Sequence, residues 1–266
     1  MLHASADKLK GSLVKNIGPM GVPVAMMHPE TIGVHAVALA EQLPGQHSLG
    51  LVRGAFLEQI GKQPATLEEM QEAVSTIRRI ADEHSIDLPL YLGGFGPKLL
   101  KLAGQLGVDG VKLGGSVNPR LAEYARTKIN NPDVDIVLGA VSVIDPDRKA
   151  ARQLARQEVA KYLDVVGPLD PTLNLDDQLS LAAFRRRFRE GDPEAGTSIS
   201  NALLDKFAIA GTPEDAQAAL EKMNGVVDRF EFGTPHGLHG RAGGLLLIGE
   251  TMVKAHHRSS HHPFCS

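Results

Sequence analysis

The chain has 266 residues, with 28 Lys and Arg against 31 Asp and Glu and a single cysteine, Cys265. This mildly acidic balance excludes a general nucleic-acid binder, and one cysteine excludes an intrachain disulfide, so the expected location is cytoplasmic. No apolar run is long enough to cross a bilayer, so we expect no membrane partner. The length suits one large α/β barrel or two ordinary domains.

Strands and helices alternate along the chain, which predicts βα units and a parallel sheet. The strands are expected near Leu13–Ile17, Leu49–Val52, Pro89–Leu92, Gly110–Leu113, Asp135–Val143 and Arg229–Phe232. The helices are expected near Glu30–Leu43, Leu67–His84, Lys98–Leu106, Arg120–Ile129, Pro146–Tyr162, Pro213–Met223 and Gly244–Ala255. A closed (β/α)₈ barrel needs eight strands, so two strands either escape recognition or are absent.

Two helix starts carry recognisable signals. Thr66 followed by Glu69 has the pattern of a capping box, in which each side chain bonds to the other residue's backbone N–H. The segment Thr212–Asp215 combines a capping threonine, a proline at the first helical position and acids in the first turn.

The periodic pattern loosens between Val165 and Phe207, which predicts an excursion of helices between the last two expected strands. This excursion contains an arginine-rich run, Arg185–Arg189. Such a run is more often a solvated helix face than a phosphate clamp, and we expect the solvated face here.

Residues 89–116 carry two glycine turns, one after each of two successive strands. The first turn is Gly93–Gly96, followed by Pro97 where a helix begins, and the second is Gly114–Ser116. Glycines let backbone N–H groups approach an anion closely, and a following helix N-terminus adds a partial positive charge. Two such turns on one edge of a parallel sheet indicate a phosphorylated ligand. The alternative is two ordinary βα turns without a ligand.

Six short stretches together resemble a known family: Ile17-Gly18-Pro19 leading through Gly21-Val22-Pro23 to His28-Pro29; Leu49–Gly54; Tyr91–Lys98; Asp109–Val111; Gly211–Glu214; and Phe232–Gly237. In their order and spacing the chain resembles the bacterial-luciferase-like flavoprotein superfamily. The resemblance is strongest to the branch of methylenetetrahydromethanopterin reductase and other reductases that use a deazaflavin, coenzyme F-420.

This resemblance implies an α/β fold of the (β/α)₈ TIM-barrel type. Only Met1–Ser12 precedes the strand expected at Leu13–Ile17, which leads into the Ile17-Gly18-Pro19 segment, whereas the family has two βα units before this segment. We therefore expect an incomplete barrel in which strands three to eight are present and the first two are missing. Residues 1–255 would form this single domain, and residues 256–266 a disordered His-rich tail, although the tail also holds potential ligands for a soft metal.

The resemblance also implies which backbone segments bind the cofactor. These are the first glycine turn (Gly93, Gly94, Phe95, Gly96, Pro97 and Lys98), the second (Gly114, Gly115 and Ser116) and the loop after the last strand (Gly233, Thr234, Pro235 and Gly237). Ser116 is expected to add a hydroxyl donor. Lys98 is expected to pair with a phosphate, or else to be merely solvated.

A further pair, Gly21 and Val22, matches the family position of a non-prolyl cis peptide that forms a bulge behind the cofactor ring. The flanking residues Met20 and Pro23 depart from the family pattern, which argues against the cis bond.

Three side chains are candidate catalytic residues. His28 would lie near the ring edge, or simply precede the helix that Pro29 begins. Arg53 would neutralise an acidic group of the cofactor or substrate, or form a surface salt bridge. His236 would cap the cofactor or carry a proton, or be an ordinary loop histidine.

The implied function is hydride transfer between a deazaflavin and a small substrate such as a pterin or a cyclic imine. The alternatives are an FMN-dependent monooxygenase of the same superfamily and a shortened, non-catalytic flavin-binding homologue. Open strand edges near Leu13–Ile17 and Arg229–Phe232 invite pairing with another chain, so we expect a homo-oligomer.

Overall fold

The computed structural model describes residues 18–45, 47–238 and 243–249. The strands of this part are β1 (Met20–Pro23), β2 (Leu49–Val52), β3 (Leu90–Gly93), β4 (Gly110–Gly114), β5 (Asp135–Ile144), β6 (Ala208–Gly211) and β7 (Arg229–His236). The helices are α2 (Pro29–Gln42), α3 (Leu67–Glu83), α4 (Pro97–Leu106), α5 (Pro119–Ile129), α6 (Arg148–Val166), α7 (Leu175–Arg189), α8 (Asn201–Phe207) and α9 (Pro213–Met223). Short 3₁₀ helices are η1 (Val24–Met26), η2 (Ala55–Ile60), η3 (Gly167–Leu169) and η4 (Ala195–Ser198). Residues 243–249 are also helical.

The chain forms two compact units. Unit 1 comprises the described residues up to Leu113 together with Ala125–Ile136, and unit 2 comprises Gly114–Tyr124 and the described residues from Val137 onward. The prediction of a single domain over residues 1–255 therefore stays a prediction.

Unit 1 contains four parallel strands in the order β1-β2-β3-β4. The register places Leu49 beside Leu90 and Tyr91 beside Gly110. β2 and β3 are almost entirely buried, as expected for parallel strands with both faces covered. Because the strands are parallel, the chain leaves each of them at the same edge of this sheet.

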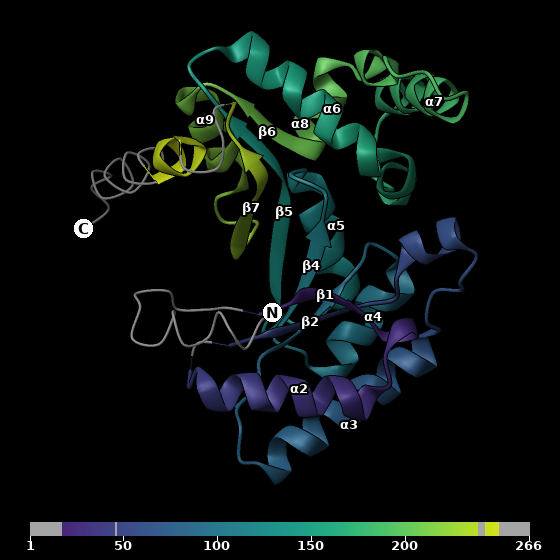
Figure 1. The fold of residues 1–266 in the computed structure, drawn as a ribbon, viewed down its shortest axis with the longest axis vertical. Coiled ribbons are helices and arrows are strands. Elements are labelled where there is room, and N and C mark those ends of the chain that lie inside the picture. The colour runs from purple at the N-terminus through teal and green to yellow at the C-terminus, as the bar shows by residue number, and fades with distance from the viewer. Residues whose placement is uncertain (1–17, 46, 239–242, 250–266) are drawn as a thin grey trace. The chain divides into compact units, whose positions relative to one another are not determined.

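The helices α2 and α3 of unit 1 lie side by side (Figure 1). A side chain at Gly33 of α2 would come within 2.8 Å of Ile80 of α3, so the glycine allows this close packing. Thr66 and Glu69 form the predicted capping box at the start of α3, with hydrogen bonds of 3.1 and 2.6 Å. The local sequence thus determines where α3 begins, and the packing against α2 places it.

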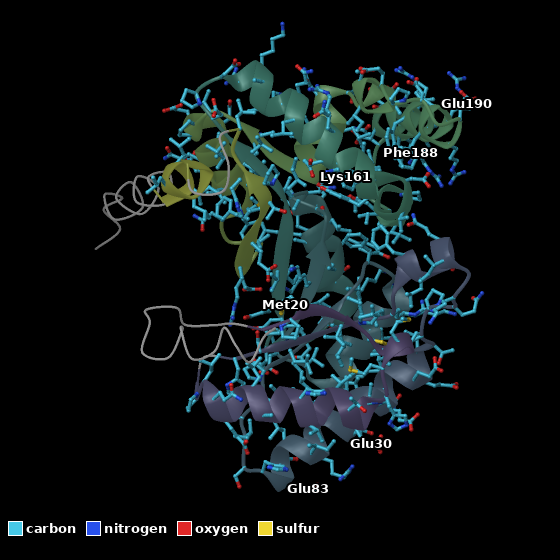
Figure 2. The ribbon with its side chains drawn as sticks, viewed as in Figure 1. Met20, Glu30, Glu83, Lys161, Phe188 and Glu190 are labelled. Carbon is cyan, nitrogen blue, oxygen red and sulfur yellow. The ribbon has the colours of Figure 1, made fainter. Side chains whose placement is uncertain are left out.

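Unit 2 is built around β5, which pairs in parallel with both β6 and β7. The predicted capping residue Thr212 accepts a hydrogen bond from the backbone of Asp215 and begins α9. The predicted excursion is present as α7, η4 and α8. Phe184 of α7 is fully buried, and its ring packs at a tilt against that of Phe188, with 5.3 Å between the ring centres. Phe188 lies near the end of α7, close to Glu190 (Figure 2).

The predicted elements that fall on described residues agree with the structure in type, and two strands were missed. The strand expected at Leu13–Ile17 lies outside the described residues, as does the second half of the helix expected at Gly244–Ala255. β1 and β6 were not predicted. Both have four residues, and β6 has the sequence Ala-Ile-Ala-Gly, which is too short and too small to show a strand pattern.

Candidate functional site

The first glycine turn lies between the end of β3 and the start of α4, in unit 1. Gly93 pairs with Val52 of β2 and with Lys112 of β4, so the turn leaves a strand that has a neighbouring strand on each side. Gly96 is the N-cap of α4, and no side chain caps this helix. The N–H groups of its first turn therefore lack a side-chain acceptor, as an anion site at a helix N-terminus requires.

Two glycines of this turn differ in what they allow. Gly94 has a φ of +151°, and a side chain there would come within 2.5 Å of Leu99. Gly96 has nothing within 4 Å of the position of a Cβ atom, so the space beside the helix N-terminus is open. Lys98, one residue into α4, is exposed and has no ion-pair partner among the described residues. The open space, the uncapped helix and the free ammonium group fit a phosphate.

Gly21 and Val22 lie in β1 of unit 1. The pairing of β1 with β2 shifts between Met20 and Val22, so the expected bulge is present. The departure of Met20 and Pro23 from the family pattern argued against a cis peptide between Gly21 and Val22, and the structure agrees, since the cis bond among the described residues joins Thr234 and Pro235. A bulge with a trans bond bends the strand without the roughly 3 kcal/mol that a non-prolyl cis bond costs.

Arg53 and His28 also lie in unit 1, and both have partners within the chain. Arg53 follows β2, and its Nε donates a hydrogen bond of 2.5 Å to the carbonyl oxygen of Ala65. The N–H of Ala65 in turn donates to the carbonyl oxygen of Arg53 at 2.9 Å. The exposed imidazole of His28 pairs with the carboxylate of Glu30. Their roles toward a cofactor stay predictions.

The second glycine turn belongs to unit 2 and is held by internal hydrogen bonds. The N–H of Gly115 donates to the carbonyl oxygen of Gly139 at 2.6 Å. Ser116 is fully buried, and its hydroxyl accepts from the N–H of Asn118 at 3.1 Å and lies 3.4 Å from the carbonyl oxygen of Lys206. A ligand contact by this hydroxyl would require these bonds to be exchanged, so its role as a donor stays a prediction.

Tyr162 of α6 covers this turn. The Cβ atom of any other residue at position 115 would lie 3.1 Å from the Tyr162 ring. Gly115 also has a φ of +83°, which favours glycine. The hydroxyl donates to the carbonyl oxygen of Phe207 at 2.6 Å. Burial raises the pKa of Tyr162 well above its usual range, so the hydroxyl remains a donor.

The predicted loop residues after the last strand are in fact the end of β7. Gly233, Thr234, Pro235 and His236 belong to this strand, and Gly237 follows it. A side chain at Gly233 would meet the carbonyl oxygen of Ala140 at 2.6 Å, so the glycine allows β7 to lie close to β5. His236 pairs with Val143 near the end of β5.

His236 is the most unusual of the predicted catalytic residues. It has a φ of +76°, which is uncommon for a residue with a side chain, and it is 9% exposed. Its Nε2 lies 3.0 Å from the carbonyl oxygen of Phe232. Its Nδ1 is buried without a hydrogen-bond partner among the described residues. An orphaned polar atom of this kind calls for an explanation, and a ligand is one.

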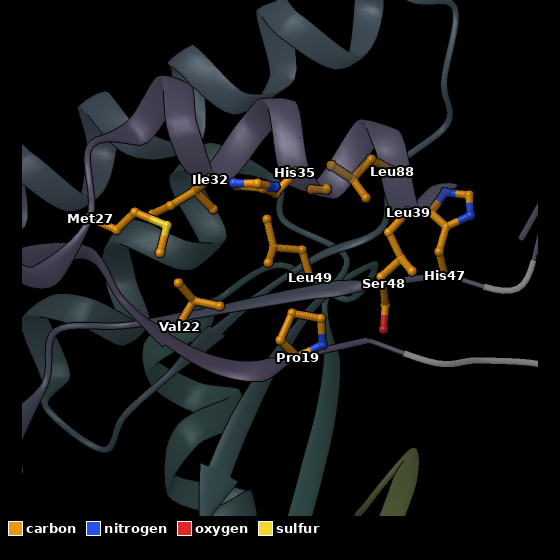
Figure 3. Close-up of a pocket in the computed structure, with 11 residues that line it drawn as sticks. Pro19, Val22, Met27, Ile32, His35, Leu39, His47, Ser48, Leu49 and Leu88 are labelled. Atoms are coloured by element: carbon orange, nitrogen blue, oxygen red, sulfur yellow. The ribbon is translucent and has the colours of Figure 1, made fainter. Parts of the chain in front are cut away.

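A cavity of about 260 Å³ lies elsewhere in unit 1, between α2 and the first two strands. Figure 3 shows Ile32, His35 and Leu39 of α2 on one side, and Val22 and Leu49 on the other. Of the predicted site residues, Val22 alone lines it. This volume is below the usual size of a pocket for a cofactor as large as a deazaflavin.

The polar residues at one end of this cavity serve the fold. The ring nitrogens of His47 lie 3.0 Å from the carbonyl oxygen of Leu43 and 2.6 Å from that of Asp87, so the imidazole joins the end of α2 to the segment before β3. The neighbouring Ser48 lies with its hydroxyl 3.9 Å from the sulfur of Met20. Both ring nitrogens of His47 are therefore taken up by contacts within unit 1.

The sequence reasoning missed two groups of hydrogen-bonded polar side chains in unit 2. One joins Asn118 to Asp170 and Thr172, and the other joins Asp177 to Lys206; Thr172 and Lys206 are half-buried and the other three are buried. Asp177 is 1% exposed and pairs with the ammonium group of Lys206. A local signal for one member exists, because Asp177 also completes a capping box with Asn174 at the start of α7. Its partner lies 29 residues away, which no local pattern reveals.

The arginine-rich run binds acids within its own unit. Arg185 and Arg189 both pair with Asp164 of α6, and Arg187 pairs with Asp192. This pairing ties α7 to α6. The run was expected to face solvent, but three of its arginines pair with two carboxylates of the same unit.

The described residues contain neither a metal-binding cluster nor a membrane-spanning helix. No group of three or more His, Cys, Asp or Glu side chains there could hold a metal ion. Among the helices of the same residues, none is both long and apolar enough to cross a membrane. The His-rich tail and Cys265 lie outside the described part of the chain.

Comparison with known proteins identifies relatives by sequence. The family model of luciferase-like monooxygenases matches residues 16–229. A 5,10-methylenetetrahydromethanopterin reductase from Methanolobus tindarius is 30% identical over 181 residues, which cover 63% of this chain and 54% of that protein. The enzyme of the same name from Archaeoglobus fulgidus is 28% identical over 224 residues, covering 70% and 66%. The chain thus spans between about half and two thirds of the length of these relatives.

Comparison of structures identifies the fold. The coenzyme F-420-dependent tetrahydromethanopterin reductase from Methanopyrus kandleri matches with a TM-score of 0.74 at 19% identity, over 89% of this chain and 82% of that one. At this level of identity the likeness concerns the fold alone. It confirms the predicted α/β fold of the (β/α)₈ type.

Proposed function

The chain belongs to the luciferase-like monooxygenase family, and we propose that it is an oxidoreductase that binds the deazaflavin coenzyme F-420. One observation carries the proposal: the uncapped N-terminus of α4, with open space beside Gly96, at the carboxyl edge of the parallel sheet of unit 1. The two relatives named methylenetetrahydromethanopterin reductase, together with the solved structure of a tetrahydromethanopterin reductase that depends on coenzyme F-420, favour a deazaflavin over FMN.

Three parts of the first glycine turn have distinct roles in this proposal: the backbone N–H groups, Lys98 and Phe95. The N–H groups at the start of α4 bind a phosphate of the cofactor, because no side chain of the described residues caps them and they lie at the positive end of the helix dipole. Lys98 adds a mobile positive charge. Phe95 is buried, so it contributes its backbone and anchors the turn. When bound, the cofactor supplies the hydride chemistry, and the protein supplies orientation and exclusion of water.

His236 is the proposed proton-holding residue of unit 2. A carbonyl oxygen accepts hydrogen bonds, so the bond to Phe232 requires the proton on Nε2 and leaves the lone pair on Nδ1. This lone pair can accept a hydrogen bond or a proton from an N–H or O–H group of a ligand. In the same unit, the second glycine turn and the end of β7 remain proposed ligand-binding segments.

The proposed substrate is a small molecule, such as a pterin or a cyclic imine, that exchanges a hydride with the cofactor. The name of the matched family supports an alternative, an FMN-dependent monooxygenase. A non-catalytic flavin-binding homologue is the third candidate.

Fluorescence titration of the cofactor-free protein with deazaflavin and, separately, with FMN tests the proposal. Tight binding of deazaflavin alone is the expected result. Binding of FMN alone would favour the monooxygenase. Binding of neither would reject a flavin-dependent function for this chain.

We also propose a homo-oligomer. Among the described residues β1 pairs with β2 alone and β7 with β5 alone, so each leaves one edge available to another chain. Light scattering of the purified protein should give at least twice the monomer mass, and a stable monomer would reject this proposal.

A further inference from the structure

The turn after β4 is fixed by residues far away in the sequence. The N–H of Val117 donates to the carbonyl oxygen of Lys206 at 2.8 Å. The side chain of Asn118 donates to Asp170 and to Thr172, at 2.9 Å in each case. These partners all belong to the helical excursion of unit 2. Its contacts, and not only the glycines, therefore determine the conformation of the second glycine turn.

Lys206 is itself held by Asp177. The carboxylate of Asp177 is almost completely buried, and the Lys206 side chain is 21% exposed. A charge-assisted hydrogen bond in such surroundings is stronger and more rigid than one at the surface, because water does not compete for it. The second carboxylate oxygen of Asp177 has no partner among the described residues, so Lys206 is the cation that compensates this buried charge.

We infer that Asp177 and Lys206 are positioning residues for ligand binding by the Gly114–Ser116 turn. Their ion pair joins α7 to α8 and thereby keeps the carbonyl oxygen of Lys206 at hydrogen-bonding distance from Val117. The inference rests on the proposed function, in which this turn contacts the ligand. In this inference the helical excursion influences how tightly the Gly114–Ser116 turn binds the ligand, although the turn lies some 90 residues earlier in the chain.

A merely local role of Asp177 is the alternative. Asp177 accepts from the N–H of Asn174 at 3.1 Å and its own N–H donates to the Asn174 side chain at 2.9 Å, which caps α7. Two variants separate the roles. Lys206→Met removes the ammonium group and leaves the cap intact, whereas Asn174→Ala weakens the cap and leaves the ion pair intact.

Hydrogen exchange of the ligand-free full chain tests whether the pair fixes the turn. We expect Lys206→Met to speed exchange of the Gly115 and Val117 amides by about 10-fold or more, because their hydrogen bonds open locally. Asn174→Ala should leave these amides within about 2-fold of the wild-type rate. If Lys206→Met does not fold, the double variant Asp177→Asn/Lys206→Met is measured in its place, because it removes both charges of the ion pair. Unchanged exchange in a folded variant would overturn the inference.

Titration with deazaflavin tests the consequence for binding. We expect Lys206→Met to weaken binding by about 10-fold, and Asn174→Ala to bind as the wild type does. Equal affinity of the wild type and Lys206→Met would overturn the inference while the proposed function stands. If the wild type binds neither deazaflavin nor FMN, the proposed function fails, and with it the ligand-binding part of the inference.

Discussion

The imidazole Nε2 of His236 lies 3.0 Å from the carbonyl oxygen of Phe232, four residues earlier in the same strand. This bond fixes the tautomer and leaves a buried lone pair on Nδ1 with no partner among the described residues. His236 also has a left-handed backbone, with a φ of +76°. An unpaired buried acceptor and an uncommon backbone conformation both cost free energy, and they cluster at functional sites.

The tautomer of His236 is open to measurement by ¹⁵N NMR of the imidazole in alkaline buffer, where the ring is neutral. We expect the proton on Nε2, and a change in the Nδ1 resonance when a ligand with an N–H or O–H group binds. His236→Asn should keep the fold, because Asn tolerates this backbone conformation, and should remove the response. The exposed His84 serves as the control resonance. A proton on Nδ1 would contradict the assignment.

The two glycines of the first turn should respond differently to a methyl group. Gly96→Ala meets open space, so the melting temperature should stay within about 2 °C while the affinity for deazaflavin falls by roughly 10-fold or more, because the methyl group occupies the phosphate space. Gly94→Ala combines a φ of +151° with a collision at Leu99, so it should lower the free energy of unfolding by about 1–3 kcal/mol. Calorimetry and titration of both variants check this. Unchanged affinity in Gly96→Ala would contradict the phosphate site.

Lys98 should contribute to binding through its charge alone. We expect Lys98→Ala to weaken deazaflavin binding by about 2- to 5-fold at low salt, and the loss should shrink as salt screens the interaction. Lys101→Ala removes an exposed lysine from the next turn of α4 and is the matched control. An equal loss in both variants would point to net charge rather than to a contact at the helix N-terminus.

Asp164 should make the stability of unit 2 depend on pH. Burial alone would raise its pKa, but the hydrogen bonds and charges of Arg185 and Arg189 outweigh burial and hold the pKa below its usual value. A carboxyl group with a lowered pKa in the folded state stabilises the protein above its unfolded pKa, and this contribution is lost as the pH falls through the folded pKa. Asp164→Asn should therefore lower the free energy of unfolding by about 1 kcal/mol at pH 7.

Urea unfolding of the wild type and of Asp164→Asn checks this by giving the free energy of unfolding of each protein. It is measured at pH 7 and again below about pH 3.5, which is under the ordinary pKa of aspartate. The difference between the two proteins should shrink at the lower pH. If it stays the same, packing of the side chain rather than its charge is responsible.

Much of the fold and part of the site could be predicted because their signals are local. The capping pairs at Thr66 and Thr212 and the proline at the start of α4 each involve neighbours in sequence. The first glycine turn was recognisable for the same reason, since glycines between a strand and a helix occupy adjacent positions. By contrast, β6 has four small residues and is a strand only because β5 pairs with it.

Local patterns in the amino-acid sequence sufficed to predict the α/β class, the positions of most helices and strands, and the glycine turn at the start of α4. Three features became visible only in the folded chain: the burial of Ser116, the pairing of Asp177 with Lys206, and an Nδ1 of His236 that has no partner among the described residues. The physical reason is the range of the interactions. Backbone conformation and helix capping depend on the nearest few residues, whereas burial and ion pairing depend on which distant segments the folded chain brings into contact.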